Sequence, residues 1–116
     1  MNDRLGDFAR LNHILEAVLE IEIYTANVSF EDFCNNSMMY NATIRQLEII
    51  GEASNKLSEV IYQDNPEIPW KRLIGLRNVI VHEYFGIDDL VIWNIITINI
   101  KNLKTQISKI IDSNIK

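Results

Sequence analysis

An arginine, a histidine and a tyrosine stand close together in the segment Arg77-Asn78-Val79-Ile80-Val81-His82-Glu83-Tyr84. Histidine is the side chain whose ordinary pKa lies nearest neutral pH, and an arginine keeps its charge and can bind a phosphate through two parallel hydrogen bonds. An arginine that holds an anion and a histidine that moves protons suffice to cleave a phosphodiester. The pair also has a structural interpretation, because basic side chains near a helix end interact with the last carbonyls and the helix dipole. Spacing alone leaves both interpretations open.

Helix geometry limits how these side chains can meet. On one continuous helix, Tyr84 returns to within about 20° of Arg77, whereas His82 lies about 140° around the axis. Either the helix therefore ends before His82, or the site is shared between two chains.

Other catalytic patterns are absent from the sequence. It contains no glycine-rich phosphate loop, no Cys/His cluster, no His-Glu-x-x-His, no paired Glu-x-x-His and no serine in a nucleophile elbow. We therefore expect catalysis without a metal ion or cofactor, carried by Arg77, His82 and their neighbours.

The composition indicates one globular domain spanning residues 1–116, with 47% hydrophobic and 23% charged residues. A net charge of −5 argues against a protein that simply coats nucleic acid. The charge is uneven: residues 11–67 hold ten acids and two bases, whereas residues 68–116 hold seven bases and four acids. A local anion site is thus compatible with the acidic total.

We expect a cytoplasmic protein that does not enter a membrane. The start of the sequence is polar and lacks the apolar core of a signal peptide. The most apolar run, residues 90–100, is too short and too polar to span a bilayer. The single cysteine, Cys34, fits a reducing compartment, and we expect it to be a small buried residue rather than a nucleophile.

Hydrophobic periodicity predicts an all-α fold, an up-and-down bundle of four main helices plus a short helical turn. The first helix covers residues 3 to about 25. Its inward stripe follows spacings of three and four through Leu5, Phe8, Leu11, Leu15, Val18 and Glu22, and Ile14, Leu19 and Ile21 widen it. Ser29 caps a short turn that carries Phe30 and Phe33. The second helix runs from about 37 to 62, and Pro69 lies in the first turn of the third. Glycines at 51 and 75 suggest close helix crossings.

The last helix is the most regular, and Asp88 is a suitable N-cap for it. Its inward seam repeats at alternating spacings of three and four, through Trp93, Ile96, Ile100, Leu103, Ile107 and Ile110. Four further isoleucines lie outside that seam: Ile92, Ile95, Ile98 and Ile111. This surplus predicts a second interface, which we expect to form a homodimer.

These residues resemble a known family. The pattern Arg77-Asn78-x-x-x-His82-x-Tyr84 is similar to the Arg-x4-His-x-Tyr signature of the HepT-like toxins, a branch of the HEPN ribonuclease superfamily. The resemblance extends over essentially the whole chain, in the family's order, through Ile50-Gly51-Glu52-Ala53, Pro66-Glu67-Ile68-Pro69-Trp70, Gly75-Leu76-Arg77-Asn78 and the stretch from His82-Glu83-Tyr84-Phe85 through Asp88 to Trp93.

The resemblance implies an all-helical homodimeric endoribonuclease with its active cleft at the dimer interface. Arg77 would bind the scissile phosphate, His82 would act as general acid and base, and Asn78 would support the site. Attack by the ribose 2′-hydroxyl would leave a cyclic phosphate.

The resemblance also implies a partner, an MntA-type nucleotidyltransferase that serves as the antitoxin of a type VII-like toxin–antitoxin system. It would transfer AMP from ATP to Tyr84 and block RNA binding. The alternative is a non-catalytic helical subunit that binds the nucleotidyltransferase, which the acidic total charge favours.

Overall fold

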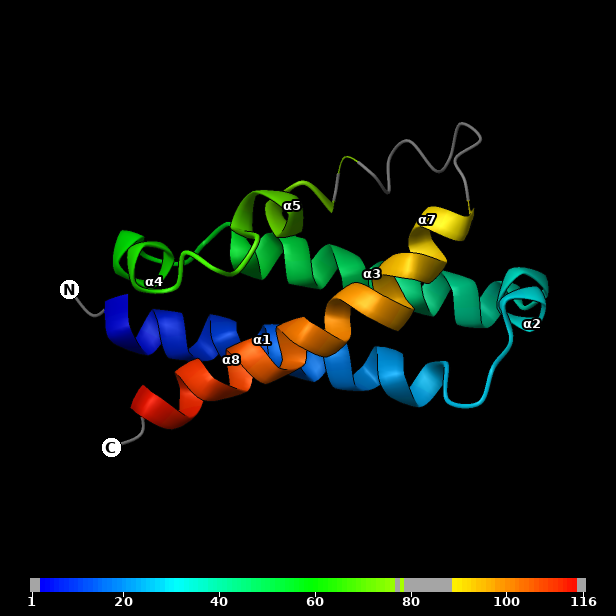
Figure 1. Cartoon of the computed structure of the whole chain (residues 1–116), viewed down its shortest axis with the longest axis horizontal. Helices are drawn as coiled ribbons and strands as arrows, with labels where there is room; N and C mark the ends of the chain where they lie inside the picture. The colour runs from blue at the N-terminus through cyan, green and yellow to red at the C-terminus, as the bar shows by residue number, and fades with distance from the viewer. Residues whose placement is uncertain (1–2, 77, 79–88, 115–116) are drawn as a thin grey trace.

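The structure is a computed structural model that describes residues 3–76, 78 and 89–114, and every regular element within these ranges is a helix (Figure 1). The predicted all-α fold is confirmed. In chain order the elements are α1 (Asp3–Tyr24), α2 (Phe30–Asn35), α3 (Ser37–Ser54), α4 (Glu59–Asp64), α5 (Trp70–Ile74), α7 (Asp89–Asn94), the π-helical segment η1 (Ile95–Asn99) and α8 (Ile100–Asn114).

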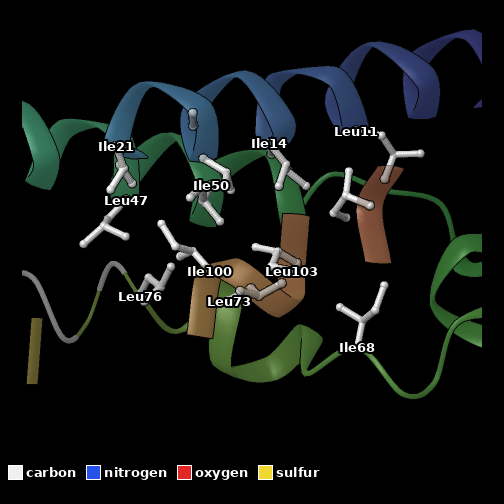
Figure 2. Close-up of a cluster of buried hydrophobic side chains, with 14 of the residues drawn as sticks. Leu11, Ile14, Ile21, Leu47, Ile50, Ile68, Leu73, Leu76, Ile100 and Leu103 are labelled. Atoms are coloured by element: carbon white, nitrogen blue, oxygen red, sulfur yellow. The ribbon is translucent and has the colours of Figure 1, made fainter. Parts of the chain in front are cut away.

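The two long helices α1 and α3 lie side by side and run in opposite directions (Figure 1). Helix α8 packs against α1, while α5 packs against α3, so the core lies between these four elements. Figure 2 shows side chains from each of them meeting there, namely Leu11, Ile14 and Ile21 of α1, Leu47 and Ile50 of α3, Leu73 of α5, and Ile100 and Leu103 of α8. None of the described helices has the length and apolar character needed to cross a bilayer.

The first helix has its predicted bounds but a different inward face. Leu11, Ile14, Val18 and Ile21 are buried, whereas Leu5 is 65% and Phe8 39% exposed. The prediction that Leu5 and Phe8 face the core is therefore wrong. At the start of α1, the inward position one turn before Leu11 belongs to the buried carboxylate of Asp7.

The predicted second helix, 37–62, is in fact two helices. Asn36 caps α3 by accepting a hydrogen bond from the backbone N–H of Met39 at 3.0 Å, and α3 ends at Ser54. After the break, Asp7 accepts hydrogen bonds from the backbone N–H of Ser58 at 2.8 Å and from its hydroxyl at 2.5 Å. Ser58 is the N-cap residue of α4. A contact from α1 thus fixes this helix start, at a serine of the type that N-cap positions favour.

The last helical unit has its predicted seam from Ile96 onward, with Ile96, Ile100, Leu103, Ile107 and Ile110 all buried. At its start the prediction is wrong, because Ile92 is buried whereas Trp93 is half-buried and packs against the edge of the core. It contains a π-helical turn in which the backbone N–H of Ile100 donates to the carbonyl of Ile95. A π turn holds more residues than an α turn. Ile92 in α7 and Ile96 in η1 both face the core, as residues four apart on a helix do.

The predicted apolar surplus on this helix is largely absent. Ile92 and Ile111 are buried in the protein's own core, and Ile95 packs against it, which leaves Ile98 exposed. Besides Ile98 in η1, Leu90 and Val91 on α7 are exposed apolar residues of this unit. The premise of the dimer prediction is thus weaker than the sequence indicated, and the dimer itself stays a prediction.

The short helical turn is confirmed as α2. Ser29 accepts a hydrogen bond from the backbone N–H of Asp32 at 3.1 Å, as an N-cap should. Phe33 is fully buried, and its ring centroid lies 5.4 Å from that of Trp93. The ring of Phe30 contacts the same tryptophan at 5.8 Å, so α2 holds α7 in place.

Candidate functional site

Helix α5 brings the chain to the first residues of the predicted site. Pro69 is its N-cap, and Trp70 and Leu73 are buried, with the indole N–H of Trp70 donating to the carbonyl of Asn65 at 3.0 Å. Gly75 follows the helix without the left-handed backbone of many helix ends, since its φ is −74°. A Cβ at Gly75 would lie 3.1 Å from the carbonyl oxygen of Lys71. The glycine therefore permits a tight turn within its own chain segment rather than the predicted helix crossing.

Beyond Gly75 the chain stays anchored as it enters the predicted catalytic segment. Leu76 is buried in the core, and the backbone N–H of Asn78 donates to the carbonyl of Gly75 at 3.0 Å. The side chain of Asn78 is exposed. Arg77, His82 and Tyr84 lie outside the described residues, as does the predicted cap Asp88, so their predicted roles remain predictions.

On the far side of that segment, α7 is held by a corner of polar and aromatic contacts. The hydroxyl of Tyr40, on α3, donates to the carboxylate of Asp89 at 2.8 Å. Burial raises the pKa of the Cys34 thiol, and the negative charge of Asp89 together with a hydrogen bond to it raises that pKa further. A thiol with a raised pKa stays protonated near neutral pH and is a poor nucleophile. Cys34 is half-buried and belongs to this structural corner.

A cavity of about 480 Å³ lies directly beside Gly75 and Leu76. We call it the α5–α8 cavity, and its walls come from α3, α5, η1 and α8. Its apolar lining is Ile50, Pro69, Leu73, Leu76, Ile95, Ile100 and Leu103. Its polar lining is Glu67, Arg72, Asn99, Asn102 and Gln106. Apolar walls with a few polar groups are typical of ligand-binding pockets.

These cavity residues were not predicted from the sequence. A signal was present, because Asn99, Asn102 and Gln106 interrupt an isoleucine-rich helix at spacings of three and four. Such spacing places them on one helix face. That face could be assigned to a cavity only once α5 was known to lie opposite it.

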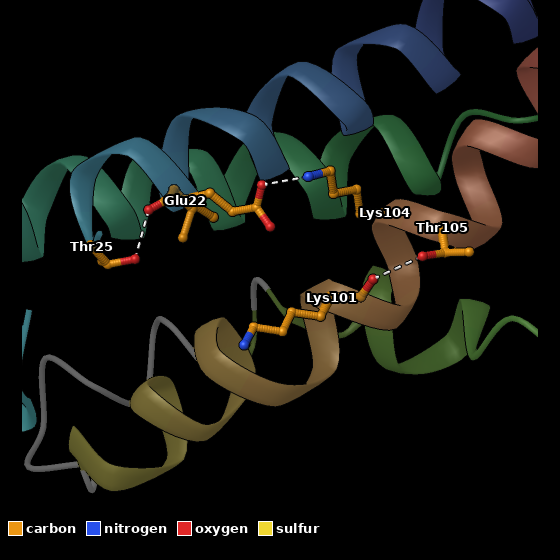
Figure 3. Close-up of polar contacts among 6 residues, drawn as sticks. Glu22, Thr25, Lys101, Lys104 and Thr105 are labelled. Carbon is orange, nitrogen blue, oxygen red and sulfur yellow. Dashed lines mark hydrogen bonds and ion pairs between the residues drawn. The ribbon is translucent and has the colours of Figure 1, made fainter. Parts of the chain in front are cut away.

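A second polar surface lies elsewhere on α8, where Lys101, Lys104, Thr105, Ser108 and Lys109 line an open cleft with Glu22 and Asp112. The ammonium group of Lys104 lies 2.9 Å from the carboxylate of Glu22 (Figure 3). Lys101 and Lys104 contribute to the excess of basic residues in 68–116, but the charge of Lys104 is already paired with Glu22 of α1. The cleft therefore offers limited positive charge for an RNA backbone.

Within residues 3–76, 78 and 89–114, no three His, Cys, Asp or Glu side chains are grouped so that they could hold a metal ion.

Tyr62 is a described titratable residue whose pKa is raised by burial of its phenol. Its ring packs edge-on against Trp70, and its hydroxyl donates to the carbonyl of Ser54 at 2.6 Å. Its role is therefore structural.

Comparisons with known proteins were made for the whole chain. Residues 14–110 match the family model described as "Ribonuclease HepT-like". The chain is 38% identical over 99 residues to a protein named putative RNase MJ1380 from Methanocaldococcus jannaschii, covering 85% of this chain and 91% of that one. It is 39% identical over 100 residues to a protein named probable ribonuclease HepT from Thermococcus cleftensis, covering 86% and 91%. No solved structure matches significantly.

The matched range contains the whole predicted catalytic segment 77–84 as well as α5, η1 and most of α8. The aligned regions extend over nearly the full length of both relatives. On these grounds, the chain belongs to the HepT-like family of ribonucleases.

Proposed function

We propose that this protein is the toxin of a type VII-like toxin–antitoxin pair, an endoribonuclease that cleaves RNA in the cytoplasm without a metal ion. The observation that carries the proposal is the family match over residues 14–110, which includes Arg77, Asn78, His82 and Tyr84. The anchoring of Leu76 in the core and of Asp89 against Tyr40 supports it, because these contacts hold the chain on both sides of the catalytic segment.

In the proposed reaction, the ribose 2′-oxygen attacks the adjacent phosphorus. His82 accepts the proton from the 2′-hydroxyl, and the guanidinium of Arg77 binds the phosphate oxygens whose charge grows in the transition state. The bond between phosphorus and the 5′-oxygen then breaks, and the departing oxygen takes up a proton from an imidazolium. The products are a 2′,3′-cyclic phosphate and a free 5′-hydroxyl. Asn78, exposed beside Arg77, donates or accepts a supporting hydrogen bond.

The active site is proposed to lie at the interface of a homodimer. On a continuous helix Arg77 and His82 would diverge by about 140°. A twofold axis can bring an arginine from one protomer to a histidine of the other. The two copies would then carry two equivalent composite sites.

Control is proposed to come from an ATP-dependent nucleotidyltransferase of the MntA type. The phenol oxygen of Tyr84 would attack the α-phosphorus of ATP, releasing pyrophosphate and leaving AMP joined to the ring. The attached phosphate carries a negative charge close to Arg77 in sequence, so it repels and sterically excludes the phosphate of RNA.

The test is to express the chain with and without the nucleotidyltransferase and to measure intact mass and RNA cleavage. The proposal predicts one or more added AMP masses at Tyr84 and loss of cleavage, with Tyr84→Phe retaining cleavage in the presence of the transferase. His82→Ala should abolish cleavage in either case. A pure, unmodified protein that cleaves no RNA but still binds the transferase would instead identify the second candidate, a non-catalytic binding subunit. The net charge of −5 is the observation that favours this second candidate.

A further inference from the structure

We propose that the α5–α8 cavity binds one nucleobase of the RNA substrate and so sets the sequence preference of cleavage. The inference rests on the proposed ribonuclease function. It concerns a site made only of described residues, namely the floor residues Leu73, Leu76 and Leu103 and the amides Asn99, Asn102 and Gln106.

The size and lining of the cavity fit a flat, partly polar ring. About 480 Å³ is within the range of pockets that enclose a small organic ligand, roughly 300–1,000 Å³. Leu73, Leu76 and Leu103 are largely buried in the core, and their few accessible atoms line the cavity. Core packing therefore holds this apolar surface in place. Figure 2 shows Leu73, Leu76 and Leu103 converging from α5, the chain after it, and α8. Such a surface can cover the face of a base.

The three amides supply what an apolar floor lacks. A side-chain amide carries both donors and an acceptor, and proteins use this combination to bind the edges of unpaired bases. Asn99 and Asn102 are exposed and Gln106 is half-buried. None of the three has a hydrogen-bond partner among the side chains and backbone groups that the structure describes. The amides are therefore free, within that part of the chain, to bind a ligand.

The π-helical turn adds a second observation at the same wall. Asn99 is the last residue of η1, and α8 begins at the next residue, Ile100. Single π turns inside α-helices are frequent at functional sites. Here the turn brings Asn99 and Ile100 to the cavity beside Leu76.

The charge at the rim fits a nucleotide better than a purely apolar ligand. Arg72 and Glu67 line the cavity, and both are exposed without an ion-pair partner among the described residues. A guanidinium can stack on a base or bind its phosphate, while a carboxylate accepts hydrogen bonds from base amino groups. The cleft around Lys101 and Lys104 has no comparable apolar floor, since all seven of its lining residues are polar or charged.

The cavity is also adjacent to the proposed chemistry. Gly75 and Leu76 form part of its wall, and Arg77 is the next residue of the chain. Consecutive Cα atoms are about 3.8 Å apart. A base in the cavity would therefore belong to a nucleotide near the one whose phosphate Arg77 binds.

The first measurement is binding, because it does not depend on cleavage. The four ribonucleoside 3′-monophosphates are titrated into the full chain while the side-chain NH2 signals of Asn99, Asn102 and Gln106 are followed by NMR. The proposal predicts that one nucleotide shifts these signals more strongly than the others. In the double variant Asn102→Ala, Gln106→Ala its affinity should fall about tenfold, since a well-placed pair of base contacts contributes on that order. The matched control, Lys101→Ala with Thr105→Ala on another face of α8, should bind as the wild type does.

The second measurement is cleavage of RNAs that differ only in the bases flanking the cut. The double variant should lose about tenfold of the preference among bases while still cleaving the RNA, whereas the control keeps it. Thermal unfolding and sedimentation of both variants verify that fold and assembly are unchanged.

The outcomes separate the two proposals. Nucleotide binding at the amides without any RNA cleavage by the wild type would overturn the ribonuclease proposal, and with it the cavity's role in cleavage preference, while nucleotide binding in the cavity would stand. Cleavage with an unchanged base preference in the double variant, and no nucleotide-dependent shift, would overturn the base site alone. Amide signals that respond to protein concentration instead of nucleotide would identify a contact between copies, which also overturns it.

Discussion

The carboxylate of Asp7 joins the first turns of α1 to the start of α4, across 51 residues of sequence. Only 7% of Asp7 is exposed, and both of its oxygens accept hydrogen bonds from Ser58. A buried carboxylate that holds the N-cap residue of a helix is stabilising as long as its partners remain, because its removal leaves two donors of Ser58 without an acceptor.

Replacement of Asp7 by alanine should lower the free energy of unfolding by about 2 kcal/mol, since the hydrogen bonds from a charged, buried group to Ser58 are lost. Urea denaturation of the purified variant measures this. The matched control is Glu16→Ala, an exposed carboxylate on the same helix, which should change stability by less than about 0.5 kcal/mol. Equal effects of the two substitutions would contradict the capping role.

Tyr62, on α4, gives the protein a pH-dependent contact with the end of α3. Burial raises the pKa of its phenol above the usual 10.0, and its hydroxyl donates to the carbonyl of Ser54. Because the unfolded state releases this proton first, the unfolded state binds fewer protons as the pH rises through about 10, and stability falls.

Comparison with Tyr62→Phe isolates that contribution. At pH 8 the variant should be less stable than the wild type by about 1 kcal/mol, the typical worth of a hydrogen bond. The difference should shrink above pH 10, where the wild type loses stability that the phenylalanine cannot lose. Urea midpoints across pH 8–11 provide the measurement, and a constant difference over that range would argue against a raised pKa for Tyr62.

At the scale of whole elements, the last helical unit contributes the inward line of the core. Ile107 is completely buried on α8, whereas Ile98 in η1 is 59% exposed. Because both residues are isoleucines, a difference between their alanine variants measures which side of the helix faces the core.

Ile107→Ala should cost about 3 kcal/mol, because it removes buried methyl groups and leaves a cavity. Ile98→Ala should cost less than about 1 kcal/mol at low protein concentration. Both are measured by urea denaturation. If the cost of Ile98→Ala rises with protein concentration, Ile98 lies in the dimer interface. Similar costs for the two variants at every concentration would contradict the described register.

The seam from Ile96 to Ile110 could be predicted from sequence because its residues repeat at spacings of three and four. Its start could not, since Ile92 rather than Trp93 is the buried residue of α7. The register of α1 could not, since Leu5 and Phe8 are as apolar as Leu11 and Ile14 but lie outside the core. The break before Ser58 was also missed, as no glycine or proline stands there and the deciding partner is Asp7. Of the candidate site, the Arg77–Tyr84 pattern is visible in sequence, whereas the cavity requires α5 and α8 to be placed together.

At the scale of the whole molecule, the proposed composite site makes activity a property of the dimer. Arg77→Ala and His82→Ala should each be inactive alone. If each site takes its arginine from one protomer and its histidine from the other, a mixed dimer of the two variants retains one intact site.

Mixing the two variants under conditions that exchange subunits should therefore restore up to about a quarter of wild-type activity, because half of the dimers are mixed and each has one intact site. Cleavage of a fluorescent RNA measures the recovery. No recovery, with subunit exchange confirmed by mass spectrometry, would show that each site draws both residues from the same protomer.

The central claim is cleavage of RNA by 2′-hydroxyl attack without a metal ion, and one measurement tests it most directly. Unmodified protein is incubated in excess EDTA with an RNA and with the same RNA carrying a single 2′-deoxy nucleotide at the cut. The account predicts a 2′,3′-cyclic phosphate from the first and no cleavage of the second, with His82→Ala inactive on both. Cleavage of the 2′-deoxy substrate at the same position, or activity that EDTA abolishes, would contradict it.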